Sequence, residues 1–388
     1  MQYGFNSPLE EYPQGEVDGP CPPRLLITKS TPQEGNKNTM INIQENIDVR
    51  DFCTLHSGGQ FRYMAKISDS ADLKKVYQFA HEKGIRVLPL GGGSNLVFND
   101  DVLNVLALKA EILGFDILSE DENSTILKIG AGENWDKFVN KVCSMGLSGV
   151  EAMSAIPGTM GATPVQNVGA YGQEIKDTLI SVDVFDTIDL EYKTLSKEDC
   201  KFRYRDSIFK TEEKGRYFIT SVAIKLSKNM PEIPNYPGVK KYFLENGVNN
   251  PSLMDIRNAI IDIRASKLPN PAEIPNVGSF FENPIVDKSI YEKIKISYPS
   301  IPSFFVSPKP GLGLEVELVK IPAGWLIENT GLKGHNFGHV SVYEKNALVL
   351  VNNGGATGQD FANARDEIIK TVFDKFGITL EQEPEIIK

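Results

Sequence analysis

The sequence has few of the residues that mark metal sites and disulfide frameworks. It contains only four cysteines and four histidines in 388 residues. The cysteines stand apart, without a C-x-x-C pair, at Cys21, Cys53, Cys143 and Cys200. We interpret them as free thiols of a reducing compartment. There is no H-E-x-x-H, and His335 and His339 flank a segment with turn and strand character, so we expect no metal site.

Long apolar runs and an excess of positive charge are also missing. No stretch of about 18 apolar residues occurs, and the first residues lack the basic region and apolar core of a signal peptide. The net charge of −10 argues against nucleic acid as the main partner. We therefore expect a cytoplasmic protein, monomeric, that binds neither membrane nor nucleic acid.

The composition is that of a soluble globular chain, with 41% apolar and 24% charged residues. A chain of this length should hold two or three domains. Residues 1–39 are rich in Pro, Gly, Glu and Asn, so we expect a disordered extension there. The pair Pro269 and Pro271 is the best candidate for an internal domain boundary.

Apolar spacing predicts the main helices and strands. Residues Leu73, Val76, Tyr77 and Ala80 follow the helical i, i+3, i+4, i+7 pattern, with Ser70 suited to the N-cap and Gly84 to the C-terminal end. Further helices are expected at 135–142, from Ser252 to Lys267, around Tyr291 and through 368–376. Strands are expected at 85–90, after the glycines that follow residue 90, at 179–185, 217–226 and 347–352. We expect a loop at 323–327.

Three consecutive glycines give the first candidate binding loop. Gly91, Gly92 and Gly93 come after Pro89-Leu90 and before Ser94-Asn95. A turn of successive N–H groups can hold an anion such as a diphosphate, and glycine permits the conformations that this needs. No Gly-Lys-Ser/Thr follows, and the loop does not open a helix, so it is neither a Walker A loop nor a Gly-x-Gly-x-x-Gly fingerprint. On these residues alone, a glycine hairpin without a ligand remains equally open.

A second small-residue loop lies about sixty residues later. Its candidate binding residues are Ser154, Ile156, Pro157, Gly158, Thr159, Gly161 and Ala162, followed by Asn167, Gly169, Ala170 and Tyr171. Two such loops can hold one long diphosphate ligand from both sides. Together they resemble the FAD-binding domain of the vanillyl-alcohol-oxidase type of flavoproteins.

Three further motifs narrow the resemblance. They are Tyr204-Arg205-Asp206-Ser207-Ile208-Phe209-Lys210, Asn276-Val-Gly-Ser-Phe-Phe-Glu-Asn-Pro284 and Glu383-Pro384-Glu385. With the two loops they are similar to the UDP-N-acetylenolpyruvoylglucosamine reductase family, over residues 40–385. The resemblance implies an α+β fold: a vanillyl-alcohol-oxidase/PCMH-type FAD-binding domain in two subdomains, 40–94 and 95–268, and a C-terminal α+β substrate-binding domain, 269–388. It also implies non-covalent FAD, NADPH, and UDP-N-acetylglucosamine enolpyruvate as substrate.

The resemblance gives roles to individual residues. Arg205 would bind the substrate carboxylate, Ser279 would be the proton donor, and Glu385 would be the third catalytic residue. Without the family these would read as a solvated charge, a turn hydroxyl and an exposed acid near the end of the sequence, where fraying would place the carboxylate poorly. The implied substrate-binding residues are Tyr204, Tyr236, Arg264, Lys267 and Asn283.

The sequence departs from the family pattern at a few positions. Val277 stands where a small residue is usual, Glu282 where lysine is common, and Cys53-Thr54-Leu55 where Asn-Thr-Phe is usual.

Two other functions stay open: a flavin oxidase of the same superfamily, and a non-catalytic flavin or nucleotide-sugar binding protein. The oxidases often attach flavin covalently, and no histidine or cysteine adjoins the first glycine loop.

Overall fold

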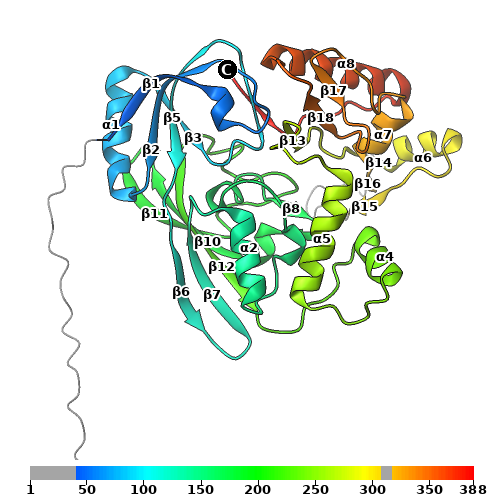
Figure 1. Ribbon diagram of the computed structural model, residues 1–388, viewed down its shortest axis with the longest axis horizontal. Coiled ribbons are helices and arrows are strands. Elements are labelled where there is room, and N and C mark those ends of the chain that lie inside the picture. The colour runs from blue at the N-terminus through cyan, green and yellow to red at the C-terminus, as the bar shows by residue number, and fades with distance from the viewer. Residues whose placement is uncertain (1–40, 307–316) are drawn as a thin grey trace, which may run out of the picture. The chain divides into compact units, whose positions relative to one another are not determined.

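The first sheet has four strands in the order β1-β2-β5-β3, and its last strand leads into the glycine loop (Figure 1). The computed structural model describes residues 41–306 and 317–388, so the expected extension at 1–39 lies outside the described residues. The strands are β1 (Ile43–Asp48), β2 (Gln60–Ile67), β3 (Arg86–Leu90) and β5 (Val102–Ala110). Strands β2 and β3 both run parallel to β5, which confirms the expected strand–helix–strand unit.

Helix α1 (Leu73–Lys83) connects β2 to β3. Its buried side chains include Leu73, Val76 and Ala80, as the spacing predicts, and Gly84 closes the helix with a φ of 64°. The predicted N-cap is wrong. Ser70 opens a 3-10 turn (Ser70–Asp72) whose own cap is the Asp69 carboxylate, because that carboxylate accepts the Ala71 N–H at 2.9 Å.

The second sheet has five antiparallel strands in the order β11-β10-β12-β7-β6. They are β6 (Phe115–Glu120), β7 (Ser124–Gly130), β10 (Leu179–Asp186), β11 (Glu191–Ser196) and β12 (Tyr217–Ser227). Helix α2 (Trp135–Ser144) shares a core with this sheet, and the Trp135 ring within that core is fully buried. The second glycine loop follows α2 in the chain and precedes β10 of this sheet.

Helix α5 (Leu253–Lys267) begins as predicted, at a capping box in which Ser252 and Asp255 exchange hydrogen bonds. It packs against α4 (Pro237–Glu245), whose N-cap position is Tyr236. Arg257 of α5 forms a salt bridge with Asp136 of α2 at 2.7 Å. The same Asp136 carboxylate accepts the Ala155 N–H at 2.6 Å, so α5 and α2 jointly anchor the second loop.

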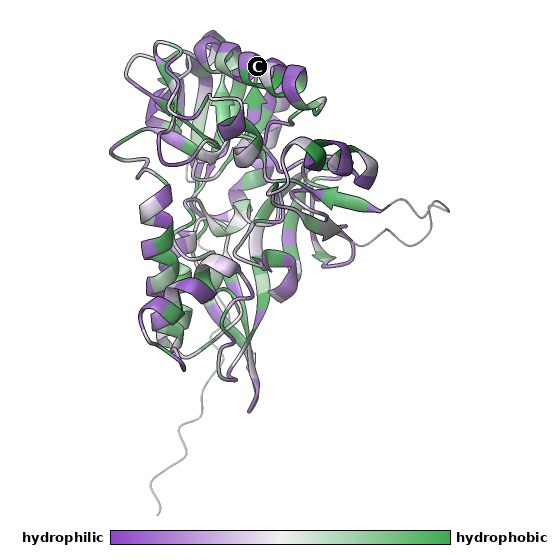
Figure 2. Cartoon of the chain, turned by 90° about the vertical axis from the view of Figure 1, so that its right-hand side faces the viewer, coloured by the Kyte–Doolittle hydropathy of each residue, from purple (hydrophilic) through white to green (hydrophobic). Residues whose placement is uncertain are grey.

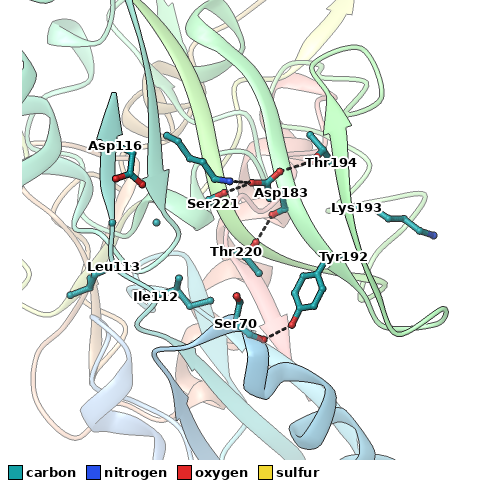
Figure 3. A pocket seen from close by; sticks show the side chains of 13 residues that line it. Ser70, Ile112, Leu113, Asp116, Asp183, Tyr192, Lys193, Thr194, Thr220 and Ser221 are labelled. Atoms are coloured by element: carbon teal, nitrogen blue, oxygen red, sulfur yellow. Dashed lines mark hydrogen bonds and ion pairs between the residues drawn. The ribbon is translucent and has the colours of Figure 1, made fainter. Parts of the chain in front are cut away.

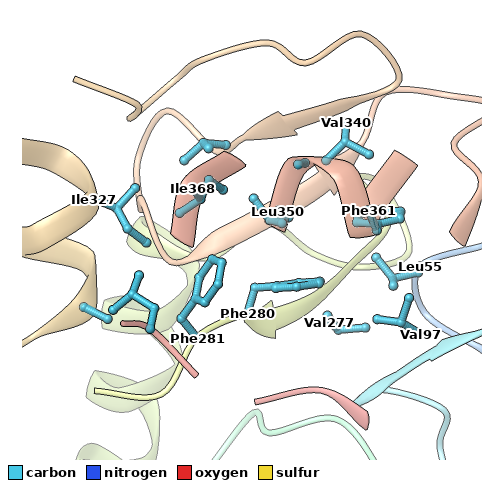
Figure 4. Packing of buried hydrophobic residues seen from close by; sticks show 14 of the residues in the cluster. Leu55, Val97, Val277, Phe280, Phe281, Ile327, Val340, Leu350, Phe361 and Ile368 are labelled. Carbon is cyan, nitrogen blue, oxygen red and sulfur yellow. The ribbon is translucent and has the colours of Figure 1, made fainter. Parts of the chain in front are cut away.

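The C-terminal elements share their core with strands β2, β3 and β5 of the first sheet and with β4 (Leu96–Phe98). Figure 4 shows part of this core, with Val97 of β4 near the side chains of the C-terminal elements. Two three-stranded sheets occur, β13-β18-β17 and β14-β16-β15. Their strands are β13 (Asn276–Ser279), β14 (Ile285–Asp287), β15 (Phe304–Val306), β16 (Leu318–Lys320), β17 (Val340–Val342) and β18 (Val349–Asn352), and the helices are α6 (Lys288–Ser297), α7 (Ala323–Asn329) and α8 (Gly358–Phe376).

The expected loop at 323–327 is wrong, because these residues form α7. Leu326 and Ile327 are fully buried in the core, and the Trp325 ring lies 5.8 Å from that of Phe376 in α8. The three buried residues of this seven-residue helix were too few to reveal a helical period in the sequence.

The remaining elements are short. They are the 3-10 turns Val49–Phe52, Glu151–Met153 and Met160–Ala162, the strands β8 (Gly169–Ala170), β9 (Gln173–Glu174) and β19 (Glu385–Ile387), and helix α3 (Ile175–Thr178). Strand β19 pairs in parallel with β4, so the end of the described chain lies beside the strand that leaves the glycine loop. Coloured by hydropathy, the described helices show alternating polar and apolar faces (Figure 2). Within the described ranges, we find no helix with the length and hydrophobicity needed to cross a bilayer.

The domain boundaries at 94 and 268 stay a prediction. Residues 41–388 form one compact unit. Strand β5, on the far side of the expected boundary at 94, lies between β2 and β3 in the first sheet.

Candidate active site

The two glycine-rich loops pack directly against each other. A Cβ on Gly92 would lie 2.7 Å from the Gly158 Cα, and a Cβ on Gly93, whose φ is +65°, would lie 1.9 Å from the Phe52 carbonyl oxygen. The Ser94 hydroxyl donates to the Pro157 carbonyl at 3.2 Å. The glycines are therefore required first by backbone contacts within the protein, a reason that the sequence did not reveal.

The first loop presents unpaired backbone donors. Among the described residues, the N–H groups of Gly92, Gly93, Ser94 and Asn95 donate no hydrogen bond. Four consecutive free N–H groups form a nest that favours an anion. In the second loop, by contrast, the N–H groups of Gly161 and Ala162 are already bonded to the carbonyls of Ala131 and Thr159, so those two residues offer no backbone donor to a ligand.

Buried hydroxyls without partners lie beside the first loop. Thr54 Oγ1 and Thr159 Oγ1 are buried and find no hydrogen-bond partner among the described residues. The backbone N–H of Thr54 donates to the Gly93 carbonyl at 3.2 Å, and Thr159 Oγ1 lies 2.8 Å from where a Cβ of Gly91 would be. An unsatisfied buried hydroxyl is costly, so these groups fit a polar ligand held between the loops.

Lys109 is a basic residue that the sequence reading missed. It lies on β5, and its Nζ donates to the Gly91 carbonyl. Burial lowers the pKa of this ammonium group. A partly buried cation at the first glycine loop stabilises a ligand with a negatively charged diphosphate. Its only signal in the sequence is a lysine within a largely apolar strand.

Asn167, predicted to bind the cofactor, has its side chain occupied by the protein. Its Nδ2 donates to Glu174 at 3.0 Å and to the Arg203 carbonyl at 2.9 Å, and its Oδ1 accepts the Lys176 N–H at 3.2 Å. The side chain therefore holds the turn that contains Arg205.

Arg205 lies in a tight turn with a left-handed φ of +53°. Arg203 and Asp206 exchange backbone hydrogen bonds around it, at 3.0 and 3.3 Å. Its Nε lies 3.1 Å from Glu383 Oε1, although the angle is too poor for an aligned hydrogen bond. Burial raises the pKa of Glu383, and the Arg205 cation opposes that rise.

Two more ion pairs join the segment after Arg205 to the C-terminal elements. Lys210 Nζ lies 3.1 Å from Glu282 and also donates to the Arg205 carbonyl at 3.0 Å. Lys214 Nζ lies 2.8 Å from Glu385, whose side chain is 34% exposed. Glu385 is in β19, and its N–H donates to the Asn95 carbonyl at 3.0 Å, so the strand does not fray there.

Ser279 ends β13 on the segment next to Glu383. The Glu383 N–H donates to the carbonyl of Phe280, the residue after Ser279, at 3.0 Å. Within the described ranges, the Ser279 hydroxyl makes no hydrogen bond to the local backbone of its turn. The structure thus brings the segments of Ser279, Arg205 and Glu385 together, next to the first glycine loop.

Tyr204 and Asn283 lie on the same side as Arg205. Burial raises the pKa of the Tyr204 hydroxyl, and the Arg205 cation beside it opposes that rise. The Asn283 Oδ1 accepts the Ala323 N–H at the start of α7. Lys320 Nζ lies 4.5 Å from the Tyr204 ring centroid, and this second basic residue was also missed because β16 is short.

The other predicted substrate-binding residues form a separate cluster, together with Tyr171, for which the sequence predicts cofactor binding. The Tyr171 and Tyr236 rings meet edge to face, with centroids 5.1 Å apart. Burial lowers the pKa of Arg264, while the neighbouring Tyr171 opposes that effect. Lys267 reaches toward Gly238, 4.0 Å from the position of a Cβ there. Two cations and two tyrosines at one place suit a phosphate-bearing ligand.

A cavity of about 380 Å³ lies elsewhere, lined mainly by strands of the second sheet together with Ser70 and residues 112–114 (Figure 3). None of the predicted site residues lines it. Its Asp183 carboxylate already interacts with Lys128, Thr194 and Ser221 at 2.6 to 2.7 Å. We assign no function to this cavity, because its Asp183 carboxylate and Tyr192 hydroxyl are already bonded to neighbouring protein groups. In the described part of the chain, no cluster of three metal-ligating side chains occurs.

Comparison with known proteins shows the family. Residues 270–387 match the UDP-N-acetylenolpyruvoylglucosamine reductase C-terminal domain, and residues 62–189 match an FAD binding domain. The chain is 40% identical to the UDP-N-acetylenolpyruvoylglucosamine reductase of Flavobacterium johnsoniae, over 89% of this chain and 100% of that protein. The chain belongs to this reductase family. It is also 38% identical to the Chromobacterium violaceum reductase, over 89% of this chain and 99% of the other.

A solved structure of the reductase (MurB) from Thermus caldophilus has the same fold, with a TM-score of 0.61 over 90% of this chain and all of the other, at 22% identity. The reductase fold is thus the predicted α+β one, with an FAD-binding domain and a C-terminal reductase domain. The chain is a flavoprotein oxidoreductase of peptidoglycan precursor synthesis. Its free loop N–H groups and the unpaired Thr54 and Thr159 hydroxyls fit the FAD diphosphate and its neighbouring oxygens.

Proposed function

We propose that this reductase uses NADPH to reduce the double bond of UDP-N-acetylglucosamine enolpyruvate, giving UDP-N-acetylmuramate. When bound, FAD supplies the redox chemistry, taking hydride from NADPH and delivering it to C3 of the enolpyruvyl group. The protein must bind both ligands, orient the enolpyruvyl group and protonate C2. FAD would be held without a covalent bond, by the residues of the two glycine-rich loops.

One observation carries the proposal: the segments bearing Ser279, Arg205 and Glu385 converge beside the first glycine loop. Strand β19 with Glu385 pairs with β4, which directly follows that loop. Glu383, two residues earlier, contacts both Arg205 and the segment of Ser279. A non-catalytic binding protein would require the loops but not this convergence of a cation, a hydroxyl and carboxylates.

Arg205 would bind the carboxylate of the enolpyruvyl group. A guanidinium matches a carboxylate with two parallel hydrogen bonds. Negative charge builds on that carboxylate and at C2 when hydride arrives at C3, so a fixed cation stabilises the transition state more than the ground state. Glu385 would complete this site from the neighbouring strand.

Ser279 would give its proton to C2. A serine hydroxyl is a weak acid in water, so a neighbouring cation is needed to stabilise the alkoxide that forms, and Arg205 could serve. The cluster of Tyr236, Arg264 and Lys267 would hold the substrate diphosphate. By binding the diphosphate, which is far from the reacting atoms, these cations would orient the enolpyruvyl end of the substrate.

The replacement Ser279→Ala tests the proton-donor role by separating the two half-reactions. In anaerobic stopped-flow measurements, reduction by NADPH should proceed at nearly the wild-type rate. Reoxidation by the enolpyruvyl substrate should slow by about 100- to 10,000-fold, the usual contribution of general acid catalysis. Ser279→Cys, which keeps a proton donor, should recover part of the loss.

Ser341→Ala is the matched control. Ser341 lies on β17 in the same three-stranded sheet, and its hydroxyl accepts a hydrogen bond from Asn353 at 2.7 Å. Both of its half-reactions should match the wild type. If Ser279→Ala slows both half-reactions equally, or neither, Ser279 is a structural hydroxyl and the assignment is wrong.

A further inference from the structure

The Arg205–Glu383 pair is more buried than the nearby Lys214–Glu385 pair. The two side chains are 21% and 12% exposed, whereas those of the nearby Lys214–Glu385 pair are 55% and 34% exposed. An exposed pair contributes little, but breaking a buried one leaves an uncompensated charge. Removing the Glu383 carboxylate should therefore have a measurable effect on Arg205.

The contact of Glu383 with the guanidinium runs from Oε1 to Nε, at 3.1 Å. In the described part of the chain, neither Nη1 nor Nη2 of Arg205 donates a hydrogen bond. The two terminal nitrogens are the edge that binds a carboxylate with two parallel bonds. Glu383 thus contacts the Nε side of the guanidinium and leaves the edge formed by Nη1 and Nη2 available to a ligand.

The backbone of Arg205 is fixed by other groups. Asn167 holds the Arg203 carbonyl, and Lys210 holds the carbonyl of Arg205 itself. These contacts keep the left-handed turn, a backbone conformation that is strained for an arginine. They do not touch the guanidinium, so the loss of Glu383 would release the side chain without releasing the turn.

We propose that Glu383 is a positioning residue, which holds Arg205 at Nε so that its Nη1 and Nη2 edge faces the substrate carboxylate. The inference rests on the proposed function of Arg205. It assigns to Glu383, the first glutamate of the Glu-Pro-Glu motif, a role distinct from that of Glu385. Glu383 itself touches neither the substrate nor its reacting atoms.

Glu383→Ala and Glu383→Gln separate positioning from simple structure. Glutamine keeps an oxygen acceptor beside Nε, whereas alanine removes it. With alanine, reduction by NADPH should keep the wild-type rate, reoxidation by the enolpyruvyl substrate should slow about 100-fold, and the KM for that substrate should rise. Glutamine should recover part of the loss in reoxidation, because it keeps an oxygen beside Nε but not the negative charge.

Glu212→Ala provides the control. Glu212 pairs with Arg203 at 3.0 Å and with Lys201 at 2.7 Å on the same segment, but it makes no contact with Arg205. Its removal should leave both half-reactions unchanged. FAD content and circular dichroism establish that each variant is folded.

A second comparison keeps the test decisive if the alanine variant does not fold. Glu383→Asp keeps the charge but withdraws the oxygens from Nε, so positioning predicts that Gln is more active than Asp. The opposite order, or equal slowing of both half-reactions, would overturn the inference. If the wild type fails to be reoxidised by the substrate, the proposed function fails instead. If the wild type is reoxidised and the Glu383 variants match it, only the role of Glu383 is refuted.

Discussion

Replacing Gly92 with alanine tests whether close contact between the two glycine loops builds the FAD site. The backbone of Gly92 does not have a positive φ, so alanine is permitted there by conformation. Its Cβ, however, would lie 2.7 Å from the Gly158 Cα. Ordinary carbon contacts are about 3.5 to 4.0 Å, so the loops must separate by about 0.8 Å or more.

Overpacking of this kind costs about 1 to 3 kcal/mol. Because the strain falls on the two loops that hold one ligand, we expect it to appear in FAD affinity as a loss of about 5- to 150-fold. The assay is titration of the apoprotein with FAD, followed by flavin fluorescence, with the melting temperature measured in parallel.

Gly114→Ala is the matched control, because its Cβ would meet nothing closer than 4.0 Å and its φ is not positive. It should bind FAD as the wild type does. Equal FAD affinity in both variants would refute the reasoning. A lower melting temperature for Gly92→Ala, with FAD affinity unchanged, would show that the contact is structural only.

Two further predictions concern groups that support the loops. Lys109→Met should weaken FAD binding by about 10- to 100-fold, the value of a charge-assisted hydrogen bond, in a fluorescence titration; the exposed Lys66→Met should not, and equal affinities would contradict the role of Lys109. Burial alone would raise the pKa of Asp136, but its hydrogen bonds to Arg257 and Ala155 hold that pKa below the ordinary value. The stabilisation is therefore present above the unfolded-state pKa and is lost as the pH falls through the lower folded-state pKa. Asp136→Asn should remove this part of the acid dependence of the melting temperature, and an unchanged profile would contradict it.

Long periodic elements could be predicted from the sequence because their own residues specify them. The stripe at Trp135, Phe138, Val139 and Val142 and the capping box at Ser252 are local signals, and both helices formed as expected. Helix α7 could not be predicted in this way, because its apolar residues are explained by a core assembled from distant segments.

The features of the site likewise divide into those that a local stretch of sequence predicts and those that depend on distant residues. Each glycine loop and each of the three motifs is a continuous stretch of residues, so each could be recognised in the sequence. The contacts of Glu383 and Lys109 could not, because they join residues far apart in the chain: Arg205 with Glu383, and Gly91 with Lys109. The reading of Asn167 as a cofactor ligand likewise could not foresee that its amide is occupied by Arg203 and Glu174.

The most direct test of the central claim is an anaerobic absorption measurement on the purified full chain. The account predicts a yellow protein whose flavin is released into solution by acid, whose absorbance bleaches with NADPH, and whose colour returns when UDP-N-acetylglucosamine enolpyruvate is added without oxygen. A protein that cannot be loaded with FAD would contradict the account, as would a flavin that NADPH reduces but that only oxygen, and not the enolpyruvyl substrate, reoxidises.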